Sequence, residues 1–206
     1  MTQPVSAVTP RLPDEPISYE DFLAWALRAD VAAEWVDGRI VLMSPVSNEH
    51  QEIVVFLLTL MNVFVQRHDA GRVFVERMQM RTAPGLPGRE PDLLFVAAER
   101  DEIIRRTFVD GHADIAIEVL SDESRARDRG EKYYEYEQGG VREYWLIDPD
   151  RQVAEFSVLE GGRYRTALAG RNGVFRSSVL AGFWIDLEWL WDRPRLVDAM
   201  TALEIA

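Results

Sequence analysis

The sequence of 206 residues contains no cysteine, so disulfide bonds and thiolate metal sites are excluded. It also lacks a long apolar run. The longest, from Ile53 to Val65, has thirteen residues, whereas a helix needs about 20 to cross a bilayer. The first sixteen residues contain four prolines, no basic start and no apolar core, unlike a signal peptide. We therefore expect a soluble, cytoplasmic protein.

Basic side chains are outnumbered: the sequence contains 23 arginines and lysines and 35 aspartates and glutamates, so the net charge is −12. This charge opposes non-specific binding to a polyanion, since proteins bind phosphates largely through lysine and arginine. A function on nucleic acid therefore requires a local basic surface or metal ions. Strong acidity suits a metal-binding enzyme, although most acidic proteins are merely soluble.

Hydrophobic residues make up 47% of the sequence, which is enough for a sizeable core in a single domain. We place that domain at residues 17–193, after a loose, proline-rich arm at 1–16 and before a tail at 194–206. Ser18 has the position of an N-cap for a helix that ends near Ala29. Asp37-Gly38 predicts a hairpin turn, since a type I′ turn needs positive φ at both central residues.

Apolar periodicity outlines the remaining elements. We expect a long, deeply packed helix from Ser47 to about His68, capped by Gly71, and then one strand over residues 72–83. The same patterns predict strands at 91–98, 113–121 and 142–149, a charged helix at 124–138, and, after Pro149, hairpin-like strands and a short terminal helix near 185–191. This order predicts an α/β (α+β) fold with a mixed central sheet flanked by helices and additional C-terminal β-hairpins.

Two acids stand in strongly apolar strands. Glu118 lies in the middle of "IAIEVL", and Asp92 begins "DLLFV". A buried carboxylate must protonate, pair with a cation or bind a metal. If the strands are neighbours, the acids meet about 5 Å apart, and hard oxygen ligands suit Mg²⁺ or Mn²⁺. Alternatively, Asp92 bonds a loop amide and Glu118 pairs with an arginine such as Arg142.

The charged helix carries Asp128, Lys132 and Tyr136 at intervals of four, so the three side chains share one face. The simpler interpretation is a solvated Asp128–Lys132 ion pair, worth less than about 1 kcal/mol. The functional interpretation is that Lys132 reaches back over the strand end to the two acids. There its ammonium polarises a phosphate or orients a water molecule.

Four motifs, in this order and spacing, resemble the Uma-two family of the PD-(D/E)XK restriction-endonuclease-like superfamily: "EPD" at 90–92, "IEVLS" at 117–121, "RDRGEKYYEY" at 127–136 and "EYWLIDP" at 143–149. The resemblance extends from about Ser18 to Trp191. It implies a restriction-endonuclease-like fold with an αβββαβ core.

The resemblance also implies roles for single residues. Asp92 matches the aspartate of the "PD" motif and Glu118 the acid of the (D/E)XK strand, so both would hold Mg²⁺ or Mn²⁺. Leu120 stands where that motif places a lysine, and Lys132 from the following helix fits as its replacement. His50 corresponds to polar residues that some members supply from the long helix. It would orient water or a phosphate, or only cap the helix.

The activity implied is metal-assisted hydrolysis of phosphodiester bonds, with DNA as the substrate. Arg77 and Arg129 are candidate phosphate contacts, and Tyr136 is a further candidate substrate contact one turn beyond Lys132. Each arginine taken singly is also explained by the need to balance 35 acidic side chains.

Two other functions remain open. Leu120 and the acidic charge favour a catalytically silent nuclease-fold module that binds a partner or dimerises, and the charge alone also suits a phosphohydrolase of small substrates. Convergence of Asp92, Glu118 and Lys132 in a cleft would favour an enzyme, whereas a Lys132 facing bulk water would favour the silent module. We also expect a homodimer, because the C-terminal strands and tryptophans (Trp184, Trp189 and Trp191) offer apolar surface, unless they pack within the chain.

Overall fold

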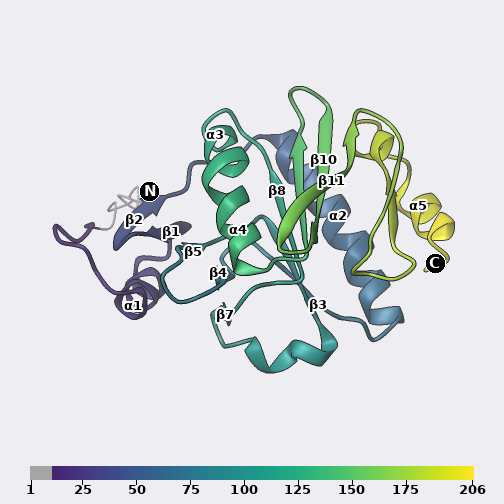
Figure 1. Ribbon diagram of the computed structural model, residues 1–206. Helices are drawn as coiled ribbons and strands as arrows, with labels where there is room; N and C mark the ends of the chain where they lie inside the picture. Colours follow the sequence, from purple (N-terminus) through teal and green to yellow (C-terminus); the bar gives the residue numbers. More distant parts are fainter. Residues whose placement is uncertain (1–10) are drawn as a thin grey trace, which may run out of the picture.

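The computed structural model describes residues 11–206, so most of the predicted arm lies outside the described residues. The described residues form a six-stranded sheet in the order β11-β10-β9-β8-β6-β3, a five-stranded sheet in the order β2-β1-β5-β4-β7, and a two-stranded sheet of β12 and β13. Figure 1 shows α1 and the β1–β2 hairpin at one end of the molecule and α5 at the other.

The six-stranded sheet consists of β3 (Gly71–Val75), β6 (Leu93–Ala97), β8 (Ile115–Val119), β9 (Glu143–Asp148), β10 (Val153–Glu160) and β11 (Arg163–Gly170). Only β8 and β9 pair in parallel among these strands. A helical segment joins them, as parallel neighbours require. With α2 before β3, the order is αβββαβ, and the predicted mixed sheet flanked by helices is confirmed.

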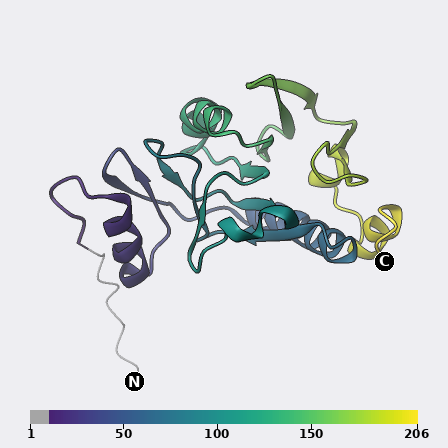
Figure 2. The ribbon, with the colours of Figure 1, turned by 60° about the horizontal axis from the view of Figure 1, so that its bottom comes forward.

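Alternate residues of the central strands enter two separate cores. Leu93 and Ile117 pack with α2 in the larger core, whereas Leu94 and Leu146 pack with Tyr136 of α4 in the second. Figures 1 and 2 show α2 and α4 on opposite sides of the sheet. Because both faces are covered, every residue of β6, β8 and β9 is buried, so an acid on these strands is withdrawn from water.

The long helix α2 (Asn48–Arg67) has Ser47 as its N-cap, which accepts a hydrogen bond from the His50 amide. It ends at Arg67 with His68 as its C-cap, so the prediction that Gly71 caps it is wrong. Gly71 instead begins β3 with φ of 144°. A Cβ at this position would clash with the Val96 carbonyl oxygen of β6, so glycine is needed for the close approach of the two strands.

The strand predicted over residues 72–83 is two strands in different sheets. β3 ends at Val75, and β4 (Gln79–Arg81) lies in the five-stranded sheet. Between them Arg77 has a positive φ of 70°, which redirects the chain. No glycine or proline interrupts residues 72–83, so the sequence did not reveal the break. As a result, Glu76 lies at the crossing between the two sheets, where its amide donates to the Asp92 carbonyl oxygen at 3.2 Å.

The five-stranded sheet contains β1 (Ala33–Val36), β2 (Arg39–Leu42), β4, β5 (Gly88–Arg89) and β7 (Phe108–Asp110), with the 3-10 helix η1 (Ala98–Ile103) before β7. Asp37 and Gly38 both have positive φ, so the predicted hairpin turn is confirmed. The Ser18 side chain accepts from the Asp21 amide at the start of α1 (Tyr19–Ala29), which confirms the predicted cap.

The charged segment after β8 is helical as predicted, but not as one regular helix. It consists of α3 (Arg125–Arg127), a π-helical turn η2 (Asp128–Lys132) and α4 (Tyr133–Gly139), which ends at Gly140 in the left-handed region. Turns of this kind are frequent at functional sites. Here the π turn holds both Asp128 and Lys132, and both are buried.

The C-terminal part contains the β10–β11 hairpin and then β12 (Val174–Arg176), β13 (Trp184–Asp186), the 3-10 helix η3 (Leu187–Leu190) and α5 (Leu196–Ala202). Trp184, Trp189 and Trp191 pack against the larger core, which favours the interpretation that they serve this chain rather than a dimer contact. Within residues 194–206, Ala199, Leu203 and Ile205 also belong to that core. No helix among residues 11–206 is long and apolar enough to cross a membrane.

Candidate active site

The two acids predicted as metal ligands are neighbours in the sheet. β6 and β8 pair antiparallel with Leu93 opposite Ile117, so Asp92 and Glu118 occupy the next position along the ladder. The Asp92 Oδ2 atom accepts a hydrogen bond of 2.7 Å from the Val119 amide, which holds this carboxylate over the end of β8. The condition for the two acids to meet, that their strands are neighbours, is therefore fulfilled.

The four residues predicted as catalytic line one pocket. Asp92 and Glu118 reach it from the sheet, His50 from the first turn of α2, and Lys132 from the π turn. The helical segment after β8 therefore folds back over the strand ends, as the functional interpretation of Lys132 requires. Their roles in catalysis stay a prediction.

Lys132 is the only lysine in the sequence, and it is fully buried. Its Nζ atom lies 2.8 Å from Glu118 Oε1, 2.9 Å from Glu34 Oε1 and 3.2 Å from Asp128 Oδ1. The ammonium donates a hydrogen bond to Glu118 Oε1 and forms ion pairs with Glu34 and Asp128, although Asp128 Oδ1 has no hydrogen-bond partner within the described residues. The interpretation of Asp128–Lys132 as a solvated ion pair is therefore wrong.

Glu34 on β1 is a member of this cluster that the sequence analysis missed. It is completely buried and also accepts from Arg89 Nη1 at 3.0 Å. Burial alone would raise the pKa of Glu34, but the charges of Lys132 and Arg89 lower it to about 2. The available signal was an acid beside Ala33 in a hairpin strand, although only the tertiary fold brings it beneath the π turn.

In Glu118 the effect of burial on the pKa outweighs that of the neighbouring cation. Burial raises the pKa of Glu118 well above its ordinary value of 4.5, and the nearby carboxylates reinforce the rise while Lys132 opposes it. Burial would lower the pKa of Lys132, but the carboxylates outweigh it and raise that pKa well above 10.5. Lys132 therefore stays charged. The negative charges of Asp128 and Asp92 act on Glu118, so a cation bound beside Glu118 is electrostatically favourable.

His50 faces Asp92 from the long helix. Its Nε2 atom lies 3.2 Å from Asp92 Oδ2, and the side chain is buried. Burial lowers the pKa of His50, whereas the hydrogen bond and the charge of Asp92 raise it, and the net shift is upward. The helix cap is made by the His50 backbone amide with Ser47, so the imidazole itself is free for a role in the pocket.

A second group of possible metal ligands includes Glu76, which the sequence analysis also missed. His50, Glu76 and Asp92 each offer one ligand atom, and these atoms all lie within 4.8 Å of one another. A divalent cation thus has two candidate ligand sets that share Asp92: the predicted pair with Glu118, and the group with His50 and Glu76. Carboxylate oxygens suit Mg²⁺ and Mn²⁺, so the donors present fit the predicted metals.

The three predicted substrate contacts have different surroundings. Arg77 is exposed and lies 2.6 Å from Asp30, whereas Arg129 reaches Glu155 on β10 at 2.6 Å. Tyr136 is buried, and its hydroxyl donates to Glu118 Oε1 at 3.1 Å. Tyr136 therefore contacts the site from inside the protein, where it can orient Glu118. Substrate binding by these three residues stays a prediction.

Glu90 is another buried acid near the pocket, two residues before Asp92, and burial raises the pKa of Glu90 from 4.5 to about 7. A folded-state pKa above the unfolded value means that stability is lost as the pH rises from 4.5 to 7. We expect Glu90→Gln to stabilise the protein by up to about 3 kcal/mol at pH 8, and by little at pH 4.5. Urea unfolding of both proteins across this range measures the difference, and a gain independent of pH would contradict the assignment.

A profile of the Uma2 family, described as "Putative restriction endonuclease", matches residues 19–188. Among solved structures, the chain is similar to a protein of Anabaena variabilis described as "a putative nuclease belonging to DUF820". The two share 18% sequence identity with a TM-score of 0.69, over 86% of this chain and 99% of the other. At this identity the likeness shows the fold alone. A search among curated proteins found no match.

Proposed function

Because the chain belongs to the Uma2 family, we propose that it is a divalent-metal-dependent nuclease that hydrolyses phosphodiester bonds in DNA. The observation that carries the proposal is the pocket itself. Two carboxylates from neighbouring strands, Asp92 and Glu118, line it together with the only lysine of the chain, which contacts Glu118. Lys132 is buried in the pocket with these acids, which is the geometry expected of an enzyme. In a silent module, Lys132 was expected to face solvent.

Asp92 would hold Mg²⁺ or Mn²⁺ in either ligand set, together with Glu118 or with His50 and Glu76. When bound, such a cation acidifies water and stabilises negative charge on the phosphate. Glu118 Oε1 is already engaged by Lys132 and Tyr136. Its second oxygen is therefore the one available to the pocket, and the two donors fix its direction.

Lys132 acts first as a positioning residue in this arrangement. Its three contacts with carboxylates hold Glu118 and keep its own charge next to the reaction site. Direct contact with a phosphate would require Lys132 to exchange one of these partners, and Asp128, at 3.2 Å, is the most distant of the three. His50, hydrogen-bonded to Asp92, holds that carboxylate or joins it as a ligand.

We also propose that the protein acts in the cytoplasm as a homodimer. The described surface exposes several large apolar side chains that could serve a second copy, among them Val55, Leu196 and Val197. Size-exclusion chromatography with light scattering tests the assembly independently of catalysis.

The nuclease proposal is tested by incubating purified protein with supercoiled plasmid and Mg²⁺ or Mn²⁺. We expect nicked and linear products, and none with EDTA or with Glu118→Gln. The exposed substitution Asp101→Asn serves as the control that keeps activity. A parallel reaction with RNA separates the two substrates. Cleavage that persists in EDTA or in Glu118→Gln would exclude the proposed site.

A further inference from the structure

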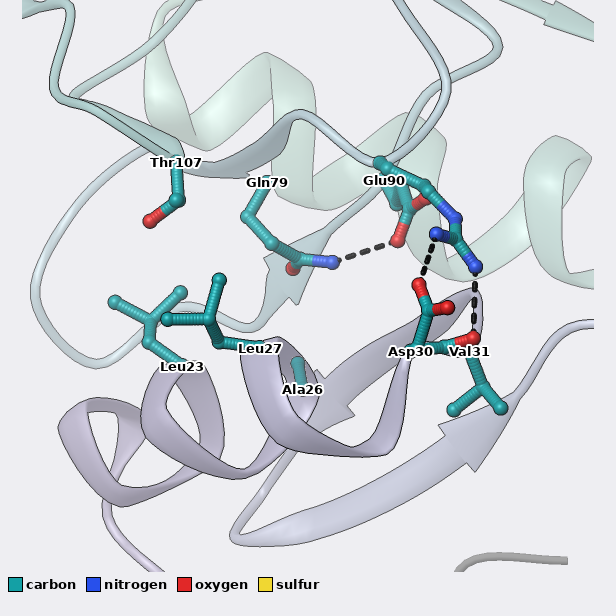
Figure 3. Close-up of a pocket in the computed structure, with 9 residues that line it drawn as sticks. Leu23, Ala26, Leu27, Asp30, Val31, Gln79, Glu90 and Thr107 are labelled. Carbon is teal, nitrogen blue, oxygen red and sulfur yellow. Dashed lines mark hydrogen bonds and ion pairs between the residues drawn. The ribbon is translucent and has the colours of Figure 1, made fainter.

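A second hollow lies beside the candidate active site, between α1 and β4 (Figure 3). Its volume is about 150 Å³. One wall is apolar and comes from α1 and the residue after its cap: Leu23, Ala26, Leu27 and Val31. The facing wall is polar and includes Gln79 and Glu90, and the ion pair of Arg77 with Asp30 also lines the hollow.

The orientation of the Gln79 amide is fixed by its neighbours. Its Nε2 atom donates to the Ala33 carbonyl oxygen at 2.6 Å and to Glu90 Oε2 at 2.8 Å. A flipped amide would place an oxygen against two acceptors, so this orientation is the only one that satisfies both. Figure 3 shows the amide above Leu23 and Leu27. The Gln79 Oε1 atom therefore faces the hollow as an acceptor.

Two oxygens of this wall have no hydrogen-bond partner within residues 11–206. They are Gln79 Oε1 and Glu90 Oε1, and their side chains are only 5% and 6% exposed. Leaving such an atom unsatisfied costs about 1–3 kcal/mol, and native proteins contain few of them. Burial raises the pKa of Glu90 to about 7, so at lower pH its Oε1 atom carries a proton, whereas Gln79 Oε1 is an acceptor at every pH. The natural partner of Gln79 Oε1 is an N–H group.

The size and chemistry of the hollow restrict its ligand. A volume of 150 Å³ corresponds to roughly five water molecules, and drug-sized sites are larger, at about 300–1,000 Å³. A small ring system fits, whereas a whole nucleotide is too large. Phosphate oxygens are acceptors only and cannot pair with Gln79 Oε1, and Arg77, the one cation among the described residues that line the hollow, is already paired with Asp30. The apolar wall suits the face of a ring, and Gln79 Oε1 suits an amino group on its edge.

The hollow adjoins the candidate metal ligands. Glu90 precedes Asp92 by two residues, a distance of about 6–7 Å along extended chain. Glu90 and Arg77 also line a neighbouring depression that contains Glu76 and Asp92. A ring bound in the hollow can therefore belong to a chain whose phosphate lies at Asp92.

We propose that this hollow binds a nucleobase carrying an exocyclic amino group, from a nucleotide beside the cleaved phosphate, with the amine donating to Gln79 Oε1. The inference rests on the proposed nuclease function and specifies the part of the substrate that is recognised. Cytosine and adenine carry the amine, whereas uracil, thymine and hypoxanthine present a carbonyl oxygen there. The base must leave the stack to enter, so single-stranded or flipped nucleotides are the substrates recognised.

The experiment uses matched pairs of nucleosides that differ only in this group: cytidine with uridine, and adenosine with inosine. Binding is followed by NMR shifts of the full-length protein in EDTA, which removes cleavage from the readout. A site built to bind a donor rejects an analogue without it, so we expect cytidine and adenosine to bind at least tenfold more tightly. Gln79→Met should remove that preference, and the nearly isosteric Glu90→Gln should reduce it, because Glu90 Oε2 holds the Gln79 amide in its orientation. Asp101→Asn should leave the preference unchanged.

Short single-stranded oligo(dC) and oligo(dT), also in EDTA, distinguish a base within a chain from a free base. Preference for oligo(dC) that Gln79→Met and Glu90→Gln reduce supports the proposal. Equal binding of both members of each pair, or no binding of any nucleoside, overturns it. A preference confined to free nucleosides assigns the hollow to a separate small ligand and overturns the substrate role. Plasmid cleavage in metal is scored separately, so a failed nuclease proposal is recognised independently.

Discussion

Replacing Lys132 with methionine is expected to lower the free energy of unfolding at pH 7 by about 3–5 kcal/mol. The substitution keeps an unbranched side chain but leaves Glu34, Glu118 and Asp128 without the ammonium that lies between them. Removing one partner of a buried charge cluster leaves the other charges uncompensated, which is more damaging than replacing the whole cluster. Urea unfolding followed by circular dichroism measures the loss.

The pH dependence distinguishes this mechanism from a simple packing defect. The pKa of Glu34 in the folded protein is about 2, below its ordinary value of 4.5. Its stabilising contribution is therefore present above pH 4.5 and is lost as the pH falls from 4.5 to 2. Because Lys132 is a main cause of that low pKa, the difference between wild type and Lys132→Met should shrink over this range. A constant difference, or one below about 1 kcal/mol as for a surface pair, would contradict the charge-cluster interpretation.

The triple substitution Glu34→Gln, Asp128→Asn and Lys132→Met is the matched control for the first prediction. It removes two of the three carboxylates together with the cation and leaves Glu118 to take up a proton, as its raised pKa allows. We expect it to be more stable than Lys132→Met alone, because fewer charges are left uncompensated. If instead the three effects add, the residues act independently.

The sequence was sufficient to predict the central sheet and the meeting of Asp92 with Glu118. Their strands are continuous apolar runs, which is the pattern of strands buried on both faces, and an acid within such a run is conspicuous. The following helix was equally visible, because Asp128, Lys132 and Tyr136 recur at helical spacing. These features depend on local periodicity and on the pairing of strands that are close in the chain.

The roles of Glu34 and Glu76 could not be predicted from periodicity, because they depend on the tertiary fold. Glu34 reaches Lys132 across 98 positions of the sequence, and only the packing of the N-terminal hairpin against the π turn brings the two together. Glu76 lies where the chain passes from one sheet to another. The turn there depends on Arg77, which has φ of 70°, and arginine is not a residue type from which positive φ can be predicted. The cluster around Lys132 is thus richer in acids than the motifs alone predict.

Asp92→Asn is expected to reduce metal-dependent DNA cleavage by about 10³-fold or more, equivalent to about 4 kcal/mol of transition-state stabilisation. Asp92 is the residue common to both candidate ligand sets, so its loss weakens metal binding whichever set is used. The fold should persist, because the asparagine carbonyl can still accept from the Val119 amide that now donates to Asp92 Oδ2. Single-turnover cleavage rates measure the effect, with Asp101→Asn as the control.

The same measurement on two further variants identifies the ligand set. If Glu118 is a direct ligand, Glu118→Gln should approach the loss seen with Asp92→Asn, whereas Glu76→Gln should cost less; the order reverses if His50, Glu76 and Asp92 hold the cation. The single lysine provides an independent readout, because selective ¹³C-lysine labelling gives one side-chain environment, that of Lys132. Mg²⁺ bound through Glu118 should shift that signal in wild type and not in Asp92→Asn. An Asp92→Asn protein that cleaves at the wild-type rate would exclude metal catalysis at this pocket, because no other residue belongs to both ligand sets.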